Sequence, residues 1–243
     1  MKIHTLLSPH NVDDLFFTGK TTVVIDVLRA TTVIATAVKN GAREVIPVGT
    51  IEFAVKISGN AFGGYTLLGG ERNTKKIDGF NLGNSPFEYT EETVSGKSII
   101  LFTTNGSKAI VKAKFSENLF MCCLNNLKSI AGHLLNIDKD VVILCSGSHG
   151  MFCIEDTVCA GILASEIRKR KPDVEFTDAV KASIVLSEHY EHDLINLLTE
   201  CEHGKLLTAN GYERDIEYCA RLNNLDVIPF FSSGVIKLAV RQE

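Results

Sequence analysis

The chain has 243 residues, enough to bury a sizeable core, and this length suits one large α/β domain better than several independent domains. Hydrophobic residues make up 45% of the chain and charged residues 22%, as is typical of a globular protein. The formal net charge of -4, without a Lys/Arg stripe interleaved with aromatic residues, argues against a nucleic-acid-binding surface.

The sequence contains neither a membrane span nor a secretion signal. No apolar run reaches the roughly 18 residues that cross a bilayer, and the N-terminus lacks a long apolar segment. The seven cysteines form no CxxC pair, and most lie in apolar runs, where a free cysteine behaves as a small hydrophobic residue. We therefore expect a soluble cytoplasmic protein, without membrane contact and without a cysteine-rich zinc site.

Apolar segments alternate with segments of helical periodicity, a pattern typical of βαβ units and a largely parallel sheet. In chain order, strands are expected at residues 1–7, 21–27, 44–49, 65–70, 98–104, 119–124, 140–145 and 226–231. Helices are predicted at residues 32–40, 107–115, 157–170, 178–200 and 213–222. The predicted protein is a single α/β domain over residues 1–243, built as one body or as two closely packed lobes.

Three of these segments run from an apolar strand through a short polar loop into a helix. Their strand ends carry Asp26 with Arg29, then residues 103–106, then residues 146–150. In an open α/β sheet, ligands bind at the carboxyl ends of parallel strands, where helix N-termini also present free N–H groups. We therefore expect the three loops to share one site for an anion such as phosphate, sulfonate or carboxylate.

Arginines and carboxylates near these loops indicate the chemistry of the site. Arg29 and Arg72 can each clamp an oxyanion through two N–H groups, which lysine cannot copy. Asp26, Glu71 and Asp156 offer oxygen ligands without paired His or Cys, and such ligands favour Mg²⁺ over Zn²⁺. Together these groups favour phosphoryl chemistry, which mainly requires positioning and neutralisation of charge.

Simpler interpretations exist for some of these residues. Thr31, Thr32 and Thr104 are also typical helix caps, and Asp156 also suits the first turn of a helix because of the helix dipole. The turn-rich segment at residues 79–89 is either a structural loop or a rim that offers Asn84 to the ligand.

Familiar phosphate-binding and nucleotide-binding signatures are missing. The sequence has no GxxxxGK[ST] loop, and no GxGxxG follows the strand at residues 21–27. Met151 stands six residues after Cys145, where a cysteine-dependent phosphatase needs arginine, and Leu28 stands where a haloacid-dehalogenase phosphatase has its second acid. These absences disfavour an NTPase, a nicotinamide enzyme and both of those phosphatase classes.

Five segments between about residues 22 and 230 resemble the 2-phosphosulfolactate phosphatase family: VVIDVLRATTVIATA, LLGGERNTKKIDGFNLGNSPFEY, TTNGSKAI, LCSGSHGMFCIEDTVCAG and EHGKLLTANGYERDIEYCA. The resemblance implies a three-layer α/β/α sandwich with a mostly parallel or mixed sheet. It also implies a Mg²⁺-dependent phosphatase that converts (2R)-2-phospho-3-sulfolactate into 3-sulfolactate and phosphate, a step associated with coenzyme M synthesis.

Matching positions and loop chemistry together select the site residues. The predicted catalytic residues are Asp26, Arg29, Glu71, Arg72, Asn105 and Asp156. The predicted substrate-binding residues are Thr31, Thr32, Asn73, Asn84, Thr104, Gly106, Ser146 and His203. Mg²⁺ is assigned to Asp26, Glu71 and Asp156, the oxyanion to the arginines and the backbone of residues 104–106, and proton transfer to His203. Family positions are also matched by Glu155, Gly204 and Asp215.

The sequence departs from the family pattern beside these residues. Thr74 stands where glycine is expected after Arg-Asn, Ser107 replaces threonine, and Ser146 and His149 make the fourth loop more polar. The exact substrate therefore stays open, as does the choice between water and a carboxylate as nucleophile. Two alternatives are a phosphatase for another small phosphorylated hydroxy acid and a non-catalytic protein that binds small anions. A homodimer is the general expectation for a soluble enzyme.

Overall fold

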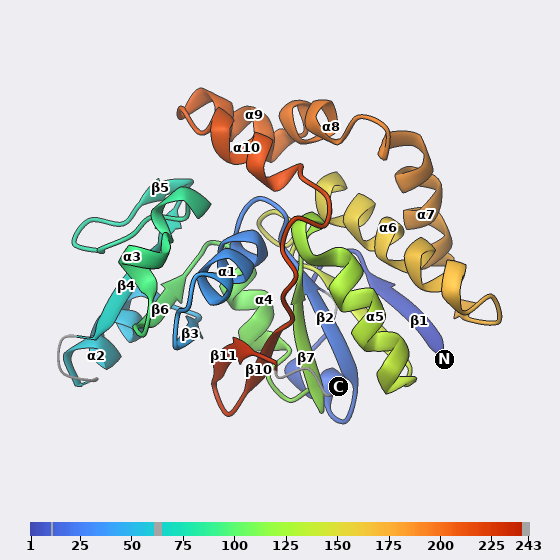
Figure 1. Ribbon diagram of the computed structural model, residues 1–243, viewed down its shortest axis with the longest axis horizontal. Helices are drawn as coiled ribbons and strands as arrows, with labels where there is room; N and C mark the ends of the chain where they lie inside the picture. Colours follow the sequence, from blue (N-terminus) through green and yellow to red (C-terminus); the bar gives the residue numbers. More distant parts are fainter. Residues whose placement is uncertain (11, 61–64, 240–243) are drawn as a thin grey trace.

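The computed structural model describes residues 1–10, 12–60 and 65–239 and contains one large mixed sheet with helices on both faces (Figure 1). The eleven strands follow the order β5-β4-β6-β3-β11-β10-β7-β2-β8-β1-β9. This arrangement confirms the predicted α/β class and the layered sandwich with a mixed sheet.

The sheet contains two groups of parallel strands. The larger group comprises β7 (Asn118–Cys122), β2 (Thr21–Ile25), β8 (Val141–Cys145), β1 (Lys2–Leu6) and β9 (Glu175–Phe176). The smaller group comprises β3 (Glu44–Val48), β6 (Ser98–Phe102) and β4 (Thr66–Arg72), with the short antiparallel β5 (Lys75–Lys76) at its edge. The carboxyl ends of β2 and β8 therefore belong to the larger group, and those of β4 and β6 belong to the smaller group.

A C-terminal hairpin joins the two groups. Its strands β10 (Pro229–Ser232) and β11 (Val235–Leu238) pair antiparallel with each other, β10 pairs with β7, and β11 pairs with β3. Residues from the end of the chain therefore complete a sheet whose other strands come from the first 176 residues.

Helices cover the two faces of the sheet. One face is covered by α1 (Ala30–Lys39) and α4 (Gly106–Lys112), and the other by α5 (Leu127–Ile137), α6 (Ile154–Arg170) and α7 (Asp178–Tyr190). A smaller core lies beneath α2 (Ile51–Asn60), beside the smaller strand group, and α3 (Glu91–Val94) is a single turn. Three 3-10 turns occupy residues 14–17, 86–88 and 124–126.

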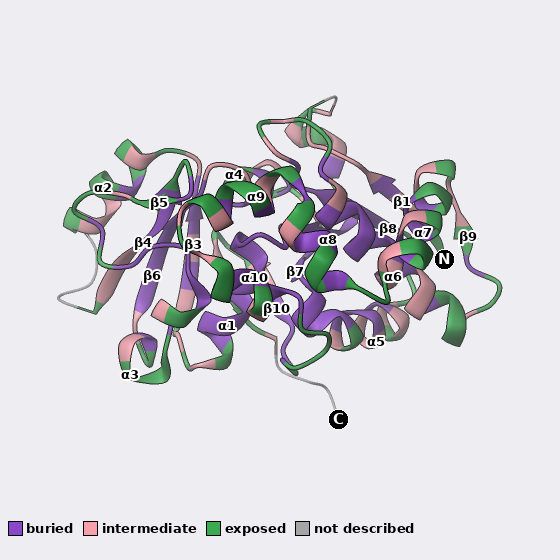
Figure 2. Ribbon diagram, turned by 90° about the horizontal axis from the view of Figure 1, so that it is seen from above, coloured by how far each residue is buried: buried purple, intermediate pink, exposed green. Residues whose placement is uncertain are grey.

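The core explains why the second part of β2, residues 23–25, is continuously apolar. Val23 and Ile25 pack into the cluster beneath α5 and α6, whereas Val24 between them packs into the cluster beneath α1 and α4. Successive side chains of a strand point to opposite faces. A strand covered on both faces can therefore be apolar at successive positions, and the central strands in Figure 2 are accordingly buried.

Three short helices lie above the sheet: α8 (Leu194–Glu200), α9 (Glu202–Ala209) and α10 (Glu213–Cys219) (Figure 1). The side chain of Asp215 in α10 reaches Arg29 at the start of α1, and the Tyr218 hydroxyl lies 3.2 Å from the Thr36 hydroxyl. The C-terminal helices thus contact the segment that follows β2.

Every predicted strand overlaps an observed one, and all five predicted helical regions contain helix. The region at residues 178–200 was wrongly predicted as continuous: it breaks before Asp193, whose side chain accepts a hydrogen bond from Asn196 N and caps α8. Helices α2, α3, α5 and α9 were not predicted, although α5 buries Leu127, Ile130, Ala131 and Leu134 at helical spacing. None of the helices in the described ranges is long and apolar enough to cross a membrane.

Close packing of α6 against α7 predicts opposite effects for two helical glycines. A Cβ atom on Gly161 would lie 2.0 Å from the carbonyl oxygen of Ser183, whereas one on Gly132 would meet only the end of Arg170 at 3.5 Å. Gly161→Ala should lower the free energy of unfolding by about 1–3 kcal/mol because the helices must separate. Gly132→Ala should leave it unchanged or raise it by up to about 1 kcal/mol through better helix propensity.

Urea denaturation followed by circular dichroism measures both changes. An unchanged midpoint for Gly161→Ala would show that the contact between α6 and α7 is looser than described.

Candidate active site

Asp26 follows the last residue of β2 and is held at the start of α1. Its Oδ1 accepts a hydrogen bond from Ala30 N at 2.9 Å, and its carbonyl accepts one from the Thr31 hydroxyl at 2.8 Å. The carboxylate is 6% exposed, and Oδ2 faces Gly106, where a Cβ atom would lie only 2.5 Å away. The absence of a side chain at Gly106 therefore leaves space for the Asp26 carboxylate.

Glu71 joins the ends of β4 and β6, which are neighbouring strands. Its Oε1 accepts a hydrogen bond from Thr104 N at 2.7 Å, and its Oε2 accepts bonds from Thr74 N at 2.8 Å and the Thr104 hydroxyl at 3.1 Å. The side chain is 7% exposed. The second and third predicted motifs thus meet at one carboxylate.

Asp156 joins the end of β8 to the end of β2. Its Oδ1 accepts a hydrogen bond from Val27 N at 2.9 Å and its Oδ2 accepts one from Gly147 N at 3.2 Å. It occupies the first turn of α6, next to Glu155, and both acids are buried. The fourth motif is therefore fixed against the first.

Burial and mutual repulsion make full ionisation of these acids unfavourable. Burial and, to a smaller extent, the charges of Glu71 and Glu155 together raise the pKa of Asp26 to about 7, although the hydrogen bond from Ala30 N lowers it. Burial, followed by the charges of Asp26 and Glu155, raises the pKa of Asp156 well above its ordinary value. Burial also raises the pKa of Glu155. A cation bound among them would favour the ionised forms.

The oxygen ligands of this cluster suit Mg²⁺, which keeps several waters, better than a metal ion that needs three or more protein ligands. Within the described residues, no three His, Cys, Asp or Glu side chains form a ready-made metal-binding group. Mg²⁺ usually keeps several waters and is held by one or two carboxylates together with substrate phosphate. Asp26 Oδ2 accepts no hydrogen bond from any described residue, whereas the oxygens of Glu71 and Asp156 each accept at least one. Asp26 is thus the acid most open to a ligand.

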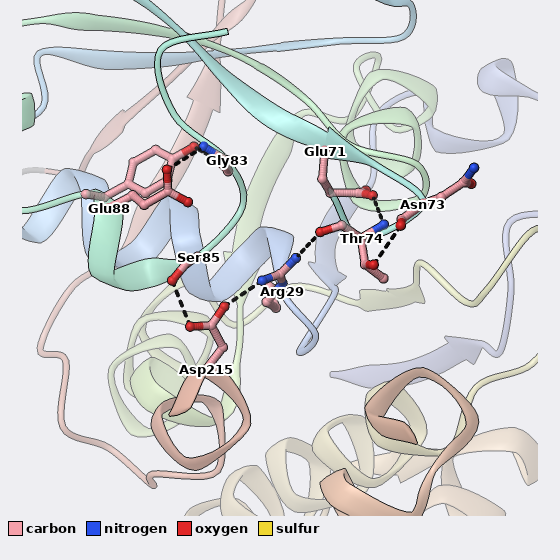
Figure 3. A network of polar contacts seen from close by, with 9 residues as sticks. Arg29, Glu71, Asn73, Thr74, Gly83, Ser85, Glu88 and Asp215 are labelled. Carbon is pink, nitrogen blue, oxygen red and sulfur yellow. Dashed lines mark hydrogen bonds and ion pairs between the residues drawn. The ribbon is translucent and has the colours of Figure 1, made fainter. Parts of the chain in front are cut away.

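Arg29 differs from the prediction, because its side chain does not reach an open site. Its Nη1 pairs with Asp215 Oδ2 at 2.5 Å, and its Nη2 donates to Thr74 O at 2.9 Å (Figure 3). Its guanidinium also lies 4.2 Å from the centre of the Tyr212 ring. The side chains of Arg29 and Asp215 are 1% and 4% exposed. The predicted oxyanion clamp of Arg29 is therefore replaced by an internal ion pair.

Sequence reasoning missed the role of three residues in this network. Asp215 also accepts a hydrogen bond from the Ser85 hydroxyl at 2.7 Å (Figure 3). Thr74 supplies the carbonyl for Arg29 and the N–H for Glu71, and it has a φ of +68°. This left-handed conformation gives a physical reason for glycine at that position in the family pattern. The match of Asp215 to a family position was the signal that could have identified it.

Thr31 and Thr32 are fully buried, and their hydroxyls bond to the chain instead of facing a cleft. Thr31 donates to Asp26 O, and Thr32 donates to Val27 O at 3.0 Å. Neither hydroxyl caps α1, because the N-cap residue is Arg29 and no side chain makes a cap hydrogen bond there. The two hydroxyls instead hold the turn between β2 and α1, and neither residue lies at a ligand surface.

Two cavities adjoin at the loop between β6 and α4. The first, of about 440 Å³, is lined by residues that include His10, Thr104, Asn105, Lys108, Lys112 and Ser146. The second, of about 330 Å³, is lined by residues that include Glu52, Arg72, Asn73, Thr104 and Lys108. Thr104 and Lys108 border both, so the predicted residues Arg72, Asn73, Asn105 and Ser146 lie around one continuous region.

Two predicted ligand residues hold buried oxygens without hydrogen-bond partners. Ser146 is 1% exposed and Asn84 is 5% exposed, and neither Ser146 Oγ nor Asn84 Oδ1 has a partner within the described chain. Asn105 Oδ1, by contrast, accepts a hydrogen bond from His149 N at 3.0 Å, which ties the third loop to the fourth. A buried polar group without a partner is costly, and a ligand can supply the missing contact.

His203 in α9 comes close to the same acids. Burial lowers its pKa to about 4, the charge of Glu71 opposes this, and the charges of Arg29 and His149 add to it. The imidazole is therefore neutral at neutral pH and can accept a proton or a hydrogen bond. Of the predicted residues, Asp26, Glu71, Asp156, Thr104, Gly106 and His203 meet around the ends of β2, β4 and β6.

Known proteins match nearly the whole chain. The sequence profile described as 2-phosphosulpholactate phosphatase matches residues 6–234. A protein from Caldanaerobacter subterraneus subsp. tengcongensis, named probable 2-phosphosulfolactate phosphatase, is 39% identical over 237 residues, 98% of each chain. Proteins with the same name from Clostridium novyi and Clostridium perfringens strain 13 are 40% and 39% identical, covering 95% and 98% of this chain and 97% and 96% of their own lengths. The matched region includes every loop described above.

Removal of Asp215 should destabilise the protein strongly. Asp215→Asn leaves the Arg29 guanidinium buried without a counter-charge, and breaking a buried pair in this way costs about 3–5 kcal/mol. Glu213→Gln, at an exposed position in the same helix, is the matched control and should change little. Urea denaturation midpoints test the difference. Equal midpoints for both variants would mean that water hydrates the Arg29 guanidinium in Asp215→Asn and replaces the ion pair.

The raised pKa of Asp26 predicts how the stability of the metal-free protein depends on pH. Between about pH 4 and pH 7 the folded protein keeps a proton that the unfolded chain has released, since the pKa rises from 3.8 to about 7 on folding. The free energy of unfolding should therefore fall as pH rises through this window and stay flat above it. Asp26→Asn removes this contribution, so its stability relative to wild type should increase from pH 5 to pH 8.

Urea midpoints in EDTA at the two pH values test this, with Asp178→Asn at a fully exposed position as the control. A constant difference between Asp26→Asn and wild type would show that Asp26 is ionised throughout.

Proposed function

This chain belongs to the 2-phosphosulpholactate phosphatase family, and from that premise we propose that it is a Mg²⁺-dependent phosphatase. The proposed reaction is hydrolysis of (2R)-2-phospho-3-sulfolactate to 3-sulfolactate and phosphate. The observation that carries the proposal is the cluster of buried acids around Asp26, because their mutual repulsion favours the binding of a cation. Cavities beside the cluster are bordered by Arg72, Lys108 and Lys112, which form no ion pair with a carboxylate of the described residues.

In the proposed site, Asp26, Glu71 and Asp156 would hold Mg²⁺. When bound there, the ion neutralises the negative charge of the phosphoryl oxygens. Glu71 and Asp156 keep their positions through backbone N–H groups, and Gly106 leaves room for Asp26. Glu71 also orients the Thr104 hydroxyl, which borders both cavities.

Positive charge for the substrate comes from side chains other than Arg29. Arg72 and Lys108 border the second cavity, and within the described residues neither forms an ion pair with a carboxylate. Arg72 keeps its predicted role of neutralising the phosphoryl group. Neutral His203 is suited to accept a proton or to hydrogen-bond the substrate.

Phosphate release from 2-phosphosulfolactate with and without Mg²⁺ tests the proposal. Wild type should release phosphate only with Mg²⁺. Asp26→Asn and Glu71→Gln should each lose at least about 100-fold in kcat/KM, because preorganised charge contributes that much to catalysis. Glu92→Gln, at an exposed position in α3, should retain wild-type activity. Full Mg²⁺-dependent activity in both site variants would refute the metal assignment.

The alternatives give different results in the same assay. Similar rates on unrelated phosphomonoesters would indicate a phosphatase of broader range, whereas saturable binding without turnover would indicate a small-anion-binding protein. Rapid quench can trap an aspartyl-phosphate if Asp26 is the nucleophile. Inversion at phosphorus with direct incorporation of solvent oxygen would instead indicate attack by water.

We also propose that the enzyme acts in the cytoplasm, which agrees with seven buried, free cysteines. A homodimer and a role in coenzyme M synthesis stay predictions. Sedimentation of the purified protein measures the oligomeric state.

A further inference from the structure

We propose that the 440 Å³ cavity bordered by Lys108, Lys112 and Ser146, which we name the basic pocket, binds the sulfonate end of the substrate. This inference rests on the proposed function and concerns the end of the substrate that does not react. The phosphoryl group would then lie towards Asp26 and Glu71, on the other side of Thr104.

The charge of the basic pocket is opposite to that of the acid cluster around Asp26. Its described lining contains Lys108, Lys112 and two histidines but neither Asp nor Glu. Neither lysine forms an ion pair with a described carboxylate, although Lys108 Nζ lies 5.7 Å from the centre of the Phe102 ring. Two unpaired ammonium groups beside an acid-free cavity favour an anionic ligand.

Ser146 gives a second and independent indication of a ligand. The side chain is 1% exposed, borders the basic pocket, and has an Oγ without a hydrogen-bond partner in the described chain. Its backbone N–H is already used by Ile25 O at 2.8 Å, so the residue is fixed at the end of β2. An anion in the pocket would accept a hydrogen bond from the Ser146 hydroxyl and so offset the free-energy cost of burying that hydroxyl without a partner.

The pocket lies at a suitable place for a substrate with two charged ends. Thr104 borders the pocket while its N–H and hydroxyl bind Glu71, so the pocket and the acid cluster share one residue as a wall. Two further lining residues, His149 and Asn105, are joined by the hydrogen bond from His149 N to Asn105 Oδ1. A short molecule can therefore place one anionic group on each side of Thr104.

A sulfonate suits these donors. It keeps its negative charge at all physiological pH values and offers three oxygens in a tetrahedral arrangement. Lys108, Lys112 and the Ser146 hydroxyl can approach such a group from different sides. The pocket would then select 2-phosphosulfolactate over 2-phospholactate, which has the same phosphate and carboxylate groups but a methyl group in place of the sulfonate arm.

Kinetics with this pair of substrates test the assignment. Lys112→Met, which removes the lysine that borders the basic pocket but not the second cavity, and Ser146→Ala should each raise KM for 2-phosphosulfolactate about tenfold. A tenfold change is the effect expected when one hydrogen bond to a charged group is lost. For 2-phospholactate the KM should change less than about twofold, and kcat should hold within the same factor for both. Lys39→Met, at the exposed end of α1, is the control and should change neither substrate. Equal effects on both substrates, or none, would overturn the proposal.

A stability measurement separates binding from a structural role. Ser146→Ala should raise or preserve the urea midpoint of the ligand-free protein, because it removes a buried hydroxyl without a partner. A lowered midpoint would mean that the hydroxyl stabilises the fold itself, which would overturn its assignment to the ligand.

Calorimetric binding of 3-sulfolactate tests the pocket without any reaction. Wild type should bind 3-sulfolactate more tightly than lactate, and Lys112→Met should reduce that difference. If wild type released no phosphate from either phosphate ester, the proposed function would fail while this titration still decided the pocket. Equal affinity of wild type for 3-sulfolactate and lactate would overturn the sulfonate assignment.

Discussion

The buried ion pair between Arg29 and Asp215 is the interaction on which the arrangement of the site depends. Both charges are almost completely removed from water, and each ion loses several kcal/mol of hydration in such a place. The pair is acceptable only because other groups complete it: Thr74 O and the Tyr212 ring for Arg29, and the Ser85 hydroxyl for Asp215. The start of α1, the turn after β4, the loop before residue 86 and α10 are therefore ordered together. Such a network contributes specificity of packing more than net stability.

Because Arg29 is buried in an ion pair with Asp215, its positive charge does not balance the acids of the candidate active site. Asp26, Glu71, Glu155 and Asp156 lie near one another, and the nearest buried cation already has a carboxylate partner. Further positive charge has to come from a bound cation or from the exposed side chains Arg72 and Lys108. The molecule thus separates an acidic region, suited to a metal ion, from a basic region, suited to an anion. A substrate with a phosphate and a second acid group matches this division.

The hairpin of β10 and β11 gives the sheet its continuity. Asp26 follows β2, and Asp156, in the first turn of α6, is bound to the ends of β2 and β8, so both belong to one parallel group. Glu71 lies in β4 and Thr104 follows β6, so both belong to the other group. The hairpin pairs with β7 on one side and with β3 on the other. The two groups also meet directly, since Gly106 leaves space for Asp26. Contacts at both the sheet and the site therefore hold the two groups together.

The sequence by itself determined the eight longer or more apolar strands, just over half of the helices and the acidic residues at strand ends, because apolar periodicity and turn residues act over a few neighbouring positions. The strands β5, β9 and β11 were not predicted. It also indicated Asp26, Glu71 and Asp156 as a group, since the loops after strands converge in this class of fold. Only the tertiary structure decided the partner of Arg29, because Asp215 lies 186 residues away and no local pattern encodes that pairing. It likewise decided that the Thr31 and Thr32 hydroxyls bond to the turn after β2, that Thr74 adopts a left-handed backbone conformation, and that Lys108 borders both cavities. Those outcomes depend on which distant surfaces pack against each residue and exclude water from it.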